Sequence, residues 1–242
     1  MGTVAIIQAR MSSTRLPGKI LAPLGNSTVL GWTIRAAQQA ESVDLVVVAT
    51  STGEDDDVTA RECETLRVPV VRGPLDDVLG RYVITASAFP ADSYVRLTAD
   101  CPLLDPRIIN QCVTLLTHSP DLDFTSNAIC PSFPRGFDVE VMTASVLEQA
   151  NAEATGFHRA HVTSWITQHP ERFRIAGIVS ATASQELRVT VDTKEDLMVV
   201  RSVVGALGDR IIRVEEVIDW LRSHPEVVAL NREVLQKEVN HG

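Results

Sequence analysis

Short apolar runs with almost no polar face alternate with segments of helical period through the first half of the chain. The apolar runs occupy residues 4–7, 45–49, 68–71 and, more weakly, 94–97. Strands that are buried on both faces, as in a parallel sheet covered by helices, have this composition. Between the runs, apolar residues recur roughly every three to four positions near 28–40, 55–66, 76–88 and 106–117, which predicts helices. We therefore predict an α/β protein with three layers, in which helices cover both faces of a mostly parallel sheet.

The second half of the chain is less regular. We expect a strand end at 123–126, further strands at 173–179 and 187–191, and helices near 143–152, 157–168, 194–206, 214–222 and 230–239. No Ser/Gly-rich linker, low-complexity stretch or internal repeat divides the 242 residues. We therefore predict a single domain that spans residues 1–242.

The composition excludes several classes of protein. With 22 Lys and Arg against 31 Asp and Glu the net charge is −9, whereas nonspecific binding to nucleic acid or anionic membranes needs excess positive charge. The four cysteines form no C-x-x-C pair, so zinc and redox motifs are unsupported and a reducing cytoplasm is indicated. The N-terminus lacks the basic start and apolar run of a signal peptide, and no run of about 18 apolar residues is present. We expect a cytoplasmic protein with no membrane span and no nucleic-acid partner.

The most informative segment is 8–19, which follows the first apolar run directly. Three cations, Arg10, Arg15 and Lys19, lie here beside three consecutive hydroxyl residues at 12–14. Because ligands of open α/β sheets bind at the carboxyl ends of the strands, this loop lies where a ligand would bind. Forked Arg donors, a Lys point charge and hydroxyl donors together suit a triphosphate. The alternative is a solvated basic turn, which leaves unexplained why an acidic protein concentrates positive charge there.

Two familiar phosphate-binding loops are excluded. Walker A requires Gly five residues before its Gly-Lys pair and Ser or Thr after it, but these positions hold Ser13 and Ile20. The dinucleotide fingerprint G-x-G-x-x-G is also absent, which removes the main signal of an NAD enzyme. Side chains, rather than glycine backbone, would therefore contact the phosphates.

Two carboxylates follow predicted strands. Asp100 comes after the fourth apolar run, and Asp192 comes after the predicted strand at 187–191. Mg²⁺ usually takes one or two carboxylates together with phosphate oxygens, so both are candidate ligands. The alternative for Asp100 is a turn or cap residue, whereas Asp105 and Asp196 are assigned structural roles at helix starts.

Two other segments carry polar groups with a weaker signal. The Gly-Pro turn within 71–82 joins a strand end to a helix start and can present backbone groups to a nucleobase. His158 and His161 lie at i, i+3 on a predicted helix, a spacing that can bind a metal ion. No carboxylate or cysteine lies at a matching spacing nearby, so we favour polar contacts over a transition-metal site.

Taken together, these segments resemble the cytidylyltransferases of the spore coat polysaccharide biosynthesis protein F group. That group is related to the CMP-sugar synthetases for 3-deoxy-manno-octulosonate and sialic-type acids. The resemblance covers roughly residues 4–205, and its most specific part is IIQARMSSTRLPGK at 6–19. The later blocks are VATS at 48–51, RG at 72–73 with DVLGRY at 77–82, TADCPL at 98–103, TSN at 125–127, GFDVEV at 136–141, HVT at 161–163 and TVDTKEDL at 190–197.

The resemblance implies a Mg²⁺-dependent nucleotidyltransferase of the glycosyltransferase-A-like α/β fold that uses CTP. The family's nucleotide-binding positions correspond to Ala9, Arg10, Ser13, Arg15, Lys19, Ser51, Arg72 and Asp77, with Arg10 and Lys19 in the catalytic roles. Its metal ligands correspond to Asp100 and Asp192, and the positions bordering the acceptor substrate to Asn127, Arg135, Asp138, Glu140, His161 and Thr163. Residues 130–180 would form the acceptor side and a possible dimerisation insertion. Because related enzymes are commonly dimers, we expect a homodimer.

Two positions depart from the family's pattern. Ala160 replaces the usual Glu in the segment before His161, and Arg135 stands where an acidic or small residue is common. The loss of a carboxylate and the gain of a guanidinium on the acceptor side hint at a more anionic acceptor, for instance a phosphonate in place of the usual sugar acid. The expected reaction is transfer of CMP from CTP to such an acceptor, with release of pyrophosphate.

Three alternatives remain. The same fold with GTP or UTP is compatible with the composition. A nucleotide-sugar glycosyltransferase usually carries a D-x-D metal motif, which Asp121, Leu122 and Asp123 match, but Asp123 begins a predicted strand rather than ending one. A non-catalytic nucleotide-binding dimer would bind CTP without consuming it.

Overall fold

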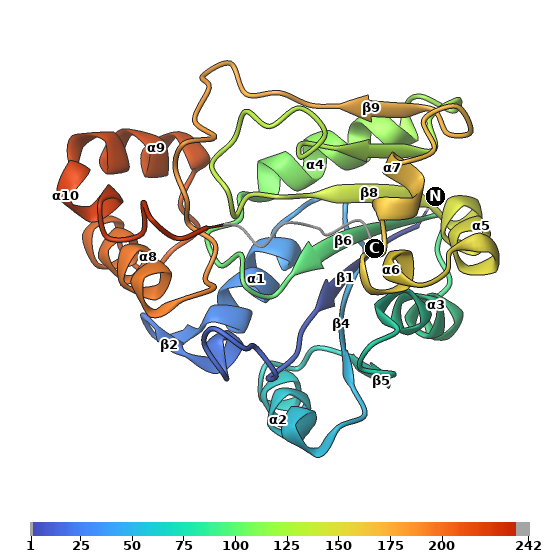
Figure 1. The fold of residues 1–242 in the computed structure, drawn as a ribbon, viewed down its shortest axis with the longest axis horizontal. Helices are drawn as coiled ribbons and strands as arrows, with labels where there is room; N and C mark the ends of the chain where they lie inside the picture. The colour runs from blue at the N-terminus through green and yellow to red at the C-terminus, as the bar shows by residue number, and fades with distance from the viewer. Residues whose placement is uncertain (1, 236–242) are drawn as a thin grey trace.

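The computed structural model describes residues 2–235, and its centre is a seven-stranded sheet in the order β5-β4-β1-β6-β8-β7-β9 (Figure 1). The strands of this sheet are β1 (Thr3–Gln8), β4 (Leu45–Ser51), β5 (Val70–Gly73), β6 (Ser93–Thr98), β7 (Phe124–Ser126), β8 (Glu140–Thr143) and β9 (Ile175–Gly177). A separate antiparallel pair consists of β2 (Pro23–Leu24) and β3 (Ser27–Thr28).

The helices of the first half lie close to their predicted positions. They are α1 (Val29–Gln38), α2 (Asp57–Thr65), α3 (Val78–Ala88) and α4 (Pro106–Thr117), with short 3-10 turns η1 (Lys19–Leu21) and η2 (Glu54–Asp56). In the second half they are α5 (Ala144–Glu153), α6 (Phe157–Ala160), α7 (Ser164–Thr167), α8 (Lys194–Leu207), α9 (Val214–Ser223) and α10 (Pro225–Val228).

The starts of α3 and α4 follow from their capping residues. The Asp77 carboxylate accepts a hydrogen bond of 2.8 Å from the Gly80 amide, and the Asp105 carboxylate accepts one of 2.9 Å from the Arg107 amide. Pro106 follows Asp105 at the first helical position, where its missing N–H removes no helical hydrogen bond. The predicted capping role of Asp105 is confirmed.

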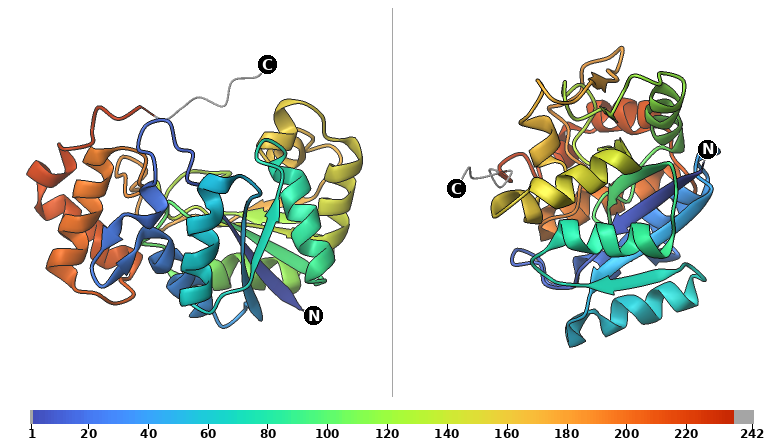
Figure 2. Two further views of the ribbon diagram at one scale, coloured as in Figure 1. Left: turned by 90° about the horizontal axis from the view of Figure 1, so that it is seen from below. Right: turned by 90° about the vertical axis from the view of Figure 1, so that its right-hand side faces the viewer.

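The central strands are buried on both faces. β1 pairs in parallel with β4 and with β6, and β4 pairs in parallel with β5. On β1, Ala5 and Ile7 belong to a core formed with α1, α4, α8 and α9, whereas Val4 and Ile6 belong to a second core formed with α3 and α5. The views in Figure 2 show helices on both sides of the sheet. The prediction of a three-layer α/β protein is confirmed.

The prediction of a strand at 187–191 is wrong. The segment forms only an isolated bridge between Arg188 and Arg135 and does not join either sheet. Its apolar alternation arises because Val189 and Val191 are buried in the main core, while the Val191 amide donates to the Asp100 carbonyl at 2.8 Å. Gly136 permits this close approach: its φ is +107°, and a Cβ there would lie 2.6 Å from the Thr190 nitrogen.

Other second-half predictions need adjustment. The helix predicted at 157–168 is two short helices, α6 and α7, because the chain turns between them to bury Val162. Only 175–177 of the strand predicted at 173–179 form a strand, β9. Strand β8 runs antiparallel to both β6 and β7. The helix predicted at 230–239 is wrong over 230–235, which form turns and irregular chain, and 236–239 lie outside the described residues. Within residues 2–235, no helix has the length and apolar character needed to span a membrane.

Candidate functional site

One edge of the sheet collects most of the predicted site residues. β1, β4, β6 and β7 all end at this edge, and β8 begins there because it runs antiparallel to its neighbours. The loop after β1 therefore lies beside the residues that follow β6. This is the edge at which open α/β sheets bind ligands.

Lys19 lies between two carboxylates at this edge. Its Nζ donates hydrogen bonds of 2.6 Å to Asp100 Oδ2 and 2.7 Å to Asp192 Oδ1. Gly18 directs the chain into this position with a left-handed φ of +71°. Burial lowers the pKa of Lys19, but the two carboxylates raise it by more, so the net pKa lies above its ordinary value. The ammonium group is therefore charged and almost removed from solvent, with the whole residue 8% exposed.

Asp192 contacts three cations. Its second oxygen, Oδ2, accepts from Arg15 Nη2 at 2.8 Å and from Arg188 Nη2 at 2.7 Å, while Oδ1 faces Lys19. Burial raises the pKa of Asp192, and Lys19, Arg15 and Arg188 together lower it below its ordinary value. The carboxylate is therefore ionised at neutral pH.

The two carboxylates suit a divalent cation. One oxygen of Asp100 and one of Asp192 converge on a single positive atom, Lys19 Nζ, so this ammonium group occupies a position suitable for a metal ion. Among the described residues, no group of three or more His, Cys, Asp or Glu side chains is placed to hold a metal. Two carboxylates completed by substrate phosphates and water are the arrangement that Mg²⁺ usually adopts.

Asp196 anchors the start of α8 next to this cluster. Thr193 and Asp196 form a reciprocal capping box, and the Asp196 carboxylate also accepts from Arg188 Nε at 2.8 Å. The side chain of Asp196 is fully buried. The predicted structural role of Asp196 is confirmed.

The loop from Arg10 to Lys19 is shaped by its own backbone. The Ser13 and Gly18 amides both donate to the Met11 carbonyl, at 2.8 and 3.1 Å. Ala9 is buried, and its amide donates to the Ala49 carbonyl, so any ligand contact at Ala9 has to come from its remaining backbone. Arg10 is exposed. Burial first, and the charge of Arg10 among the lesser causes, lower the pKa values of Arg81 and His161.

Arg72 and Asp77 make contacts within the protein. Arg72 Nε donates to the Ser51 carbonyl at 2.8 Å and Nη2 to the Gly53 carbonyl at 2.8 Å, which stabilises the turn after β4. Asp77 caps α3, and its carboxylate also accepts hydrogen bonds from Arg159 Nε at 2.8 Å and from Arg159 Nη2 at 2.7 Å. These contacts give both residues a structural role at the rim of the site.

Glu140 is the centre of a second polar cluster. Its carboxylate forms an ion pair with Arg96 and accepts from Thr163 Oγ1 at 2.7 Å. Arg96 Nε also donates to Gln8 Oε1 at 3.2 Å, so this cluster joins the ends of β1 and β6 to the turn between α6 and α7. The predicted residues Glu140 and Thr163 are therefore brought together.

The remaining predicted acceptor residues have different surroundings. The buried Asn127 side chain donates to the Phe137 carbonyl at 2.7 Å and accepts from the Val139 amide at 2.8 Å, so it holds the loop before β8. Part of the Asp138 surface is exposed in this loop, but desolvation of its carboxyl group and then Glu140 raise its pKa. His161 stacks on Phe157 with ring centroids 4.4 Å apart, and burial followed by Arg96 and Arg10 lowers its pKa.

Arg135 is not brought into contact with His161 or Thr163. Its backbone pairs with the Leu187 and Val189 backbone, and its side chain is exposed. The D-x-D match is also remote from Lys19, because Asp123 immediately precedes β7 and therefore lies at the opposite edge of the sheet. There Asp121 pairs with Arg174 Nη1 at 2.7 Å, and Asp123 accepts from the Arg174 amide at 2.8 Å.

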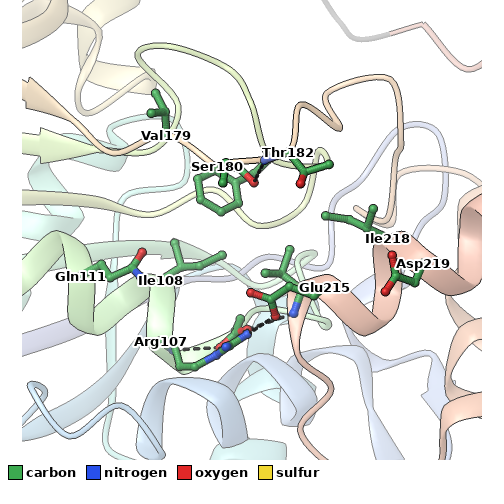
Figure 3. Close-up of a pocket in the computed structure, with 13 residues that line it drawn as sticks. Arg107, Ile108, Gln111, Val179, Ser180, Thr182, Glu215, Ile218 and Asp219 are labelled. Carbon is green, nitrogen blue, oxygen red and sulfur yellow. Dashed lines mark hydrogen bonds and ion pairs between the residues drawn. The ribbon is translucent and has the colours of Figure 1, made fainter.

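A pocket of about 530 Å³ lies away from these residues (Figure 3). The thirteen lining residues include none of the predicted site residues. Arg107 and Glu215 form an ion pair along one wall, and the exposed Val179 lies on the opposite side. The pocket therefore lies between α4, α9 and the segment 179–182, away from the edge that carries Lys19.

Residues 4–222 match the family model described as cytidylyltransferase. The chain belongs to the cytidylyltransferase family. It is 32% identical to the spore coat polysaccharide biosynthesis protein SpsF of Bacillus subtilis (strain 168), over 91% of this chain and 94% of that protein. It is 30% identical to the solved cytidylyltransferase from Leptospira borgpetersenii serovar Hardjo-bovis (strain JB197), which covers 98% of this chain and 100% of that chain with a TM-score of 0.92.

A more distant solved structure supports the fold assignment. The synthetase for CMP-2-keto-3-deoxy-manno-octonic acid, solved in complex with CTP, is 17% identical and covers 86% of this chain and 100% of that chain, with a TM-score of 0.66. This likeness, together with the mostly parallel sheet, shows that the cytidylyltransferase has the expected nucleotidyltransferase fold.

Two residues of this cytidylyltransferase escaped the sequence analysis. Asp56, 2% exposed, accepts from the Met11 amide at 2.7 Å and from the Ser51 hydroxyl, so it ties the basic loop to the end of β4. The run of four acidic residues at 54–57 was its only signal. Arg188 orients Asp192 by donating a hydrogen bond to its Oδ2. In the sequence, nothing distinguishes Arg188 from a surface cation on a strand.

Proposed function

We propose that the protein transfers CMP from CTP to a small anionic acceptor, a sugar acid or a phosphonate, with release of pyrophosphate. The observation that carries the proposal is the convergence of Lys19 with Asp100 and Asp192 beside the loop that holds Arg10 and Arg15. Membership of the cytidylyltransferase family supports the choice of nucleotide and of reaction.

The chemistry requires one bond to form and one to break. An oxygen of the acceptor attacks the α-phosphorus of CTP, and the bond from that phosphorus to the bridging oxygen of the β-phosphate breaks. Pyrophosphate leaves with the electron pair of that bond. Such a reaction depends on in-line positioning and on neutralising charge, with no covalent enzyme intermediate required.

Lys19, Arg15 and Arg10 supply the positive charge for this step. Lys19 would donate to oxygens of the α-phosphate and of the departing pyrophosphate once its contacts with Asp100 and Asp192 are exchanged. Arg15 would hold the outer phosphates, and the exposed Arg10 guanidinium is free to turn toward them. Asp100 and Asp192 would hold Mg²⁺, which supplies charge neutralisation on the phosphate and acceptor oxygens.

The second cluster supports an anionic acceptor. Arg96 is paired with Glu140, which also accepts from Thr163, two residues after His161 in the chain. Burial and then the charges of Arg96 and Arg10 lower the pKa of His161. Ala160 adds no carboxylate there. A carboxylate or phosphonate oxygen needs no proton removed before it attacks, which suits a site where Glu140 is already paired with Arg96 and Thr163.

Residues 130–180 carry β8, α5 to α7 and β9, and we assign them to the acceptor side and to a homodimer interface. β9 is the last strand in the sheet order, so its outer edge has no strand partner within the described chain. An unpaired edge of this kind is available for pairing with a second copy. The mass of the protein in solution tests this assignment: a monomer would exclude the interface.

The function is tested by measuring pyrophosphate release with Mg²⁺ and each of the four nucleoside triphosphates. Each is offered a pool of sugar acids, sugar phosphates and small phosphonates. We expect release with CTP and with one anionic acceptor class. Release with another nucleotide only would contradict the assignment of CTP, and binding of CTP without release in any pool would contradict catalysis.

A further inference from the structure

The chain beyond residue 222, which the family model does not cover, returns to the candidate site. After α10 it passes toward the loop that contains Arg15 (Figure 2, left). The Leu235 carbonyl accepts a hydrogen bond of 3.1 Å from Arg15 Nη1. Four residues earlier, Asn231 is only 4% exposed, which is unusual for a polar side chain so close to the end of the described chain.

The Asn231 side-chain amide donates hydrogen bonds to two residues that themselves contact Asp192. Its Nδ2 donates to Asp196 Oδ1 at 2.9 Å and to the Arg188 carbonyl at 3.1 Å. Asp196 Oδ1 also accepts from Arg188 Nε, so Asn231 contacts both members of this buried ion pair.

The same ion pair determines where Asp192 points. Arg188 Nη2 donates to Asp192 Oδ2 at 2.7 Å, and the Asp192 amide donates to Asp196 Oδ2 at 2.9 Å. Both the side chain and the backbone of Asp192 are therefore held by the pair that Asn231 contacts. Oδ1 of Asp192 is left to face Lys19 Nζ.

The geometry points to Asn231 as a positioning residue that holds Asp192 in the orientation needed to bind a divalent cation, acting through Arg188 and Asp196. This inference rests on the proposed role of Asp192 as a metal ligand. Groups that hydrogen-bond to the partners of a metal ligand fix its orientation, and their loss typically weakens metal binding by about 10- to 100-fold. Asn231 fits this role because a neutral amide donates to Asp196 without adding charge to a buried ion pair.

The experiment measures the factor by which Mg²⁺ tightens CTP binding, by equilibrium dialysis without an acceptor. The full chain is compared with Asn231→Ala and with Asn110→Ala as a matched control. The Asn110 side chain also takes part in two hydrogen bonds, because its Oδ1 accepts from the Ser42 amide at 3.0 Å and from the Ser42 hydroxyl at 2.8 Å. Ser42 precedes β4, so these bonds lie at the opposite edge of the sheet from Lys19. Thermal unfolding of each variant is recorded in parallel.

We expect Asn231→Ala to reduce this factor by about 10-fold or more, with Asn110→Ala indistinguishable from the natural chain. If Asn231 has only a structural role, Asn231→Ala lowers the unfolding temperature and leaves the factor unchanged, which overturns the inference. If Asn231→Ala does not fold, Asn231→Ser is measured instead. Its hydroxyl keeps one hydrogen-bond donor, so Asn231→Ser should reduce the factor by which Mg²⁺ tightens CTP binding, but by less than about 10-fold; an unchanged factor overturns the inference.

Asp192→Asn separates this inference from the proposed function. A Mg²⁺ factor that survives Asp192→Asn contradicts the metal site itself. If Mg²⁺ no longer tightens CTP binding in Asp192→Asn but still does so in folded Asn231→Ala, only the role of Asn231 is contradicted.

Discussion

The ammonium nitrogen of Lys19 lies 2.7 Å from the carboxylate of Asp192, although 173 positions separate the two residues in the sequence. The same nitrogen contacts Asp100 at 2.6 Å, so one cation neutralises two carboxylates that would otherwise repel each other. We propose that a bound metal ion and nucleotide would replace these contacts. Lys19 would then donate hydrogen bonds to the phosphate oxygens.

Replacing Lys19 by Ala should lower kcat for pyrophosphate release by about 100-fold or more, because a preorganised charge on the reacting phosphates is lost. Lys194→Ala is the matched control, since Lys194 is an exposed lysine at the start of α8. The measurement is steady-state turnover at saturating CTP, with thermal unfolding to verify that both variants fold. Full turnover in Lys19→Ala would remove Lys19 from the mechanism.

Asp100→Asn and Asp192→Asn should abolish most Mg²⁺-dependent turnover, whereas Asp121→Asn and Asp123→Asn should retain it. The first pair converges on Lys19 at the candidate site, and the second pair lies at the opposite edge of the sheet beside Arg174. The Mg²⁺ concentration at half-maximal rate is measured for all four variants. Loss of activity on changing Asp121 or Asp123 would instead favour the D-x-D motif of a glycosyltransferase.

Asp56→Ala should destabilise the protein and weaken CTP binding together. The buried Asp56 carboxylate accepts from the Met11 amide and from Ser51, and leaving such groups unpaired costs about 1–3 kcal/mol. Because Met11 is in the basic loop, KM for CTP should rise as well. Asp55→Ala, which alters an exposed neighbour, should change neither the free energy of unfolding nor KM. A stable Asp56→Ala enzyme with an unchanged KM for CTP would show that the loop from Arg10 to Lys19 keeps its shape without the hydrogen bonds of Asp56.

The ion pair between Asp77 and Arg159 predicts a pH-dependent contribution to stability. Burial raises the pKa of Asp77, but Arg159 and the Gly80 amide lower it by more, below its ordinary value of 3.8. A lowered carboxyl pKa stabilises the folded state above the ordinary value, and this contribution is lost as the pH falls through the folded-state pKa.

Asp77→Asn keeps the helix cap and removes the charge, so it should lower the free energy of unfolding by about 0.5–1 kcal/mol at pH 7. The difference from the natural chain should shrink as the pH falls below 3.8. Denaturant titrations at several pH values measure it, with the exposed Asp76→Asn as control. A difference that is constant with pH would contradict a role for the Asp77 charge.

The first half of the fold could be predicted because its strands are buried on both faces. Residues 4–7 and 45–49 have no polar face, which is typical of strands in a parallel sheet covered by helices, and all of them except Leu45 are buried. Residues 187–191 alternate apolar and polar side chains as a strand would, but for a different reason: they are buried between the loops at Asp100 and Arg135. Local composition reports burial, and it does not distinguish a sheet from a buried loop.

The site could be predicted where chain order alone determines proximity. Lys19 and Asp100 both follow strands that end at one edge, so their meeting follows from the topology. Asp56 and Asn231 could not be found in this way, since their roles depend on tertiary hydrogen bonds to a backbone amide and to a buried ion pair. Asp77 and Arg72 were assigned to the nucleotide, and the structure shows both making contacts that stabilise the rim.

The most direct test of the central claim is phosphorus NMR of the natural chain incubated with CTP, Mg²⁺ and the acceptor class selected by the pyrophosphate screen. We predict that the three CTP signals are replaced by pyrophosphate and by a new signal from the CMP phosphorus bonded to the acceptor, in equal molar amounts. A phosphonate acceptor adds a second new signal, from its own phosphorus. Formation of CDP with inorganic phosphate, or of free CMP with no acceptor adduct, would contradict cytidylyl transfer.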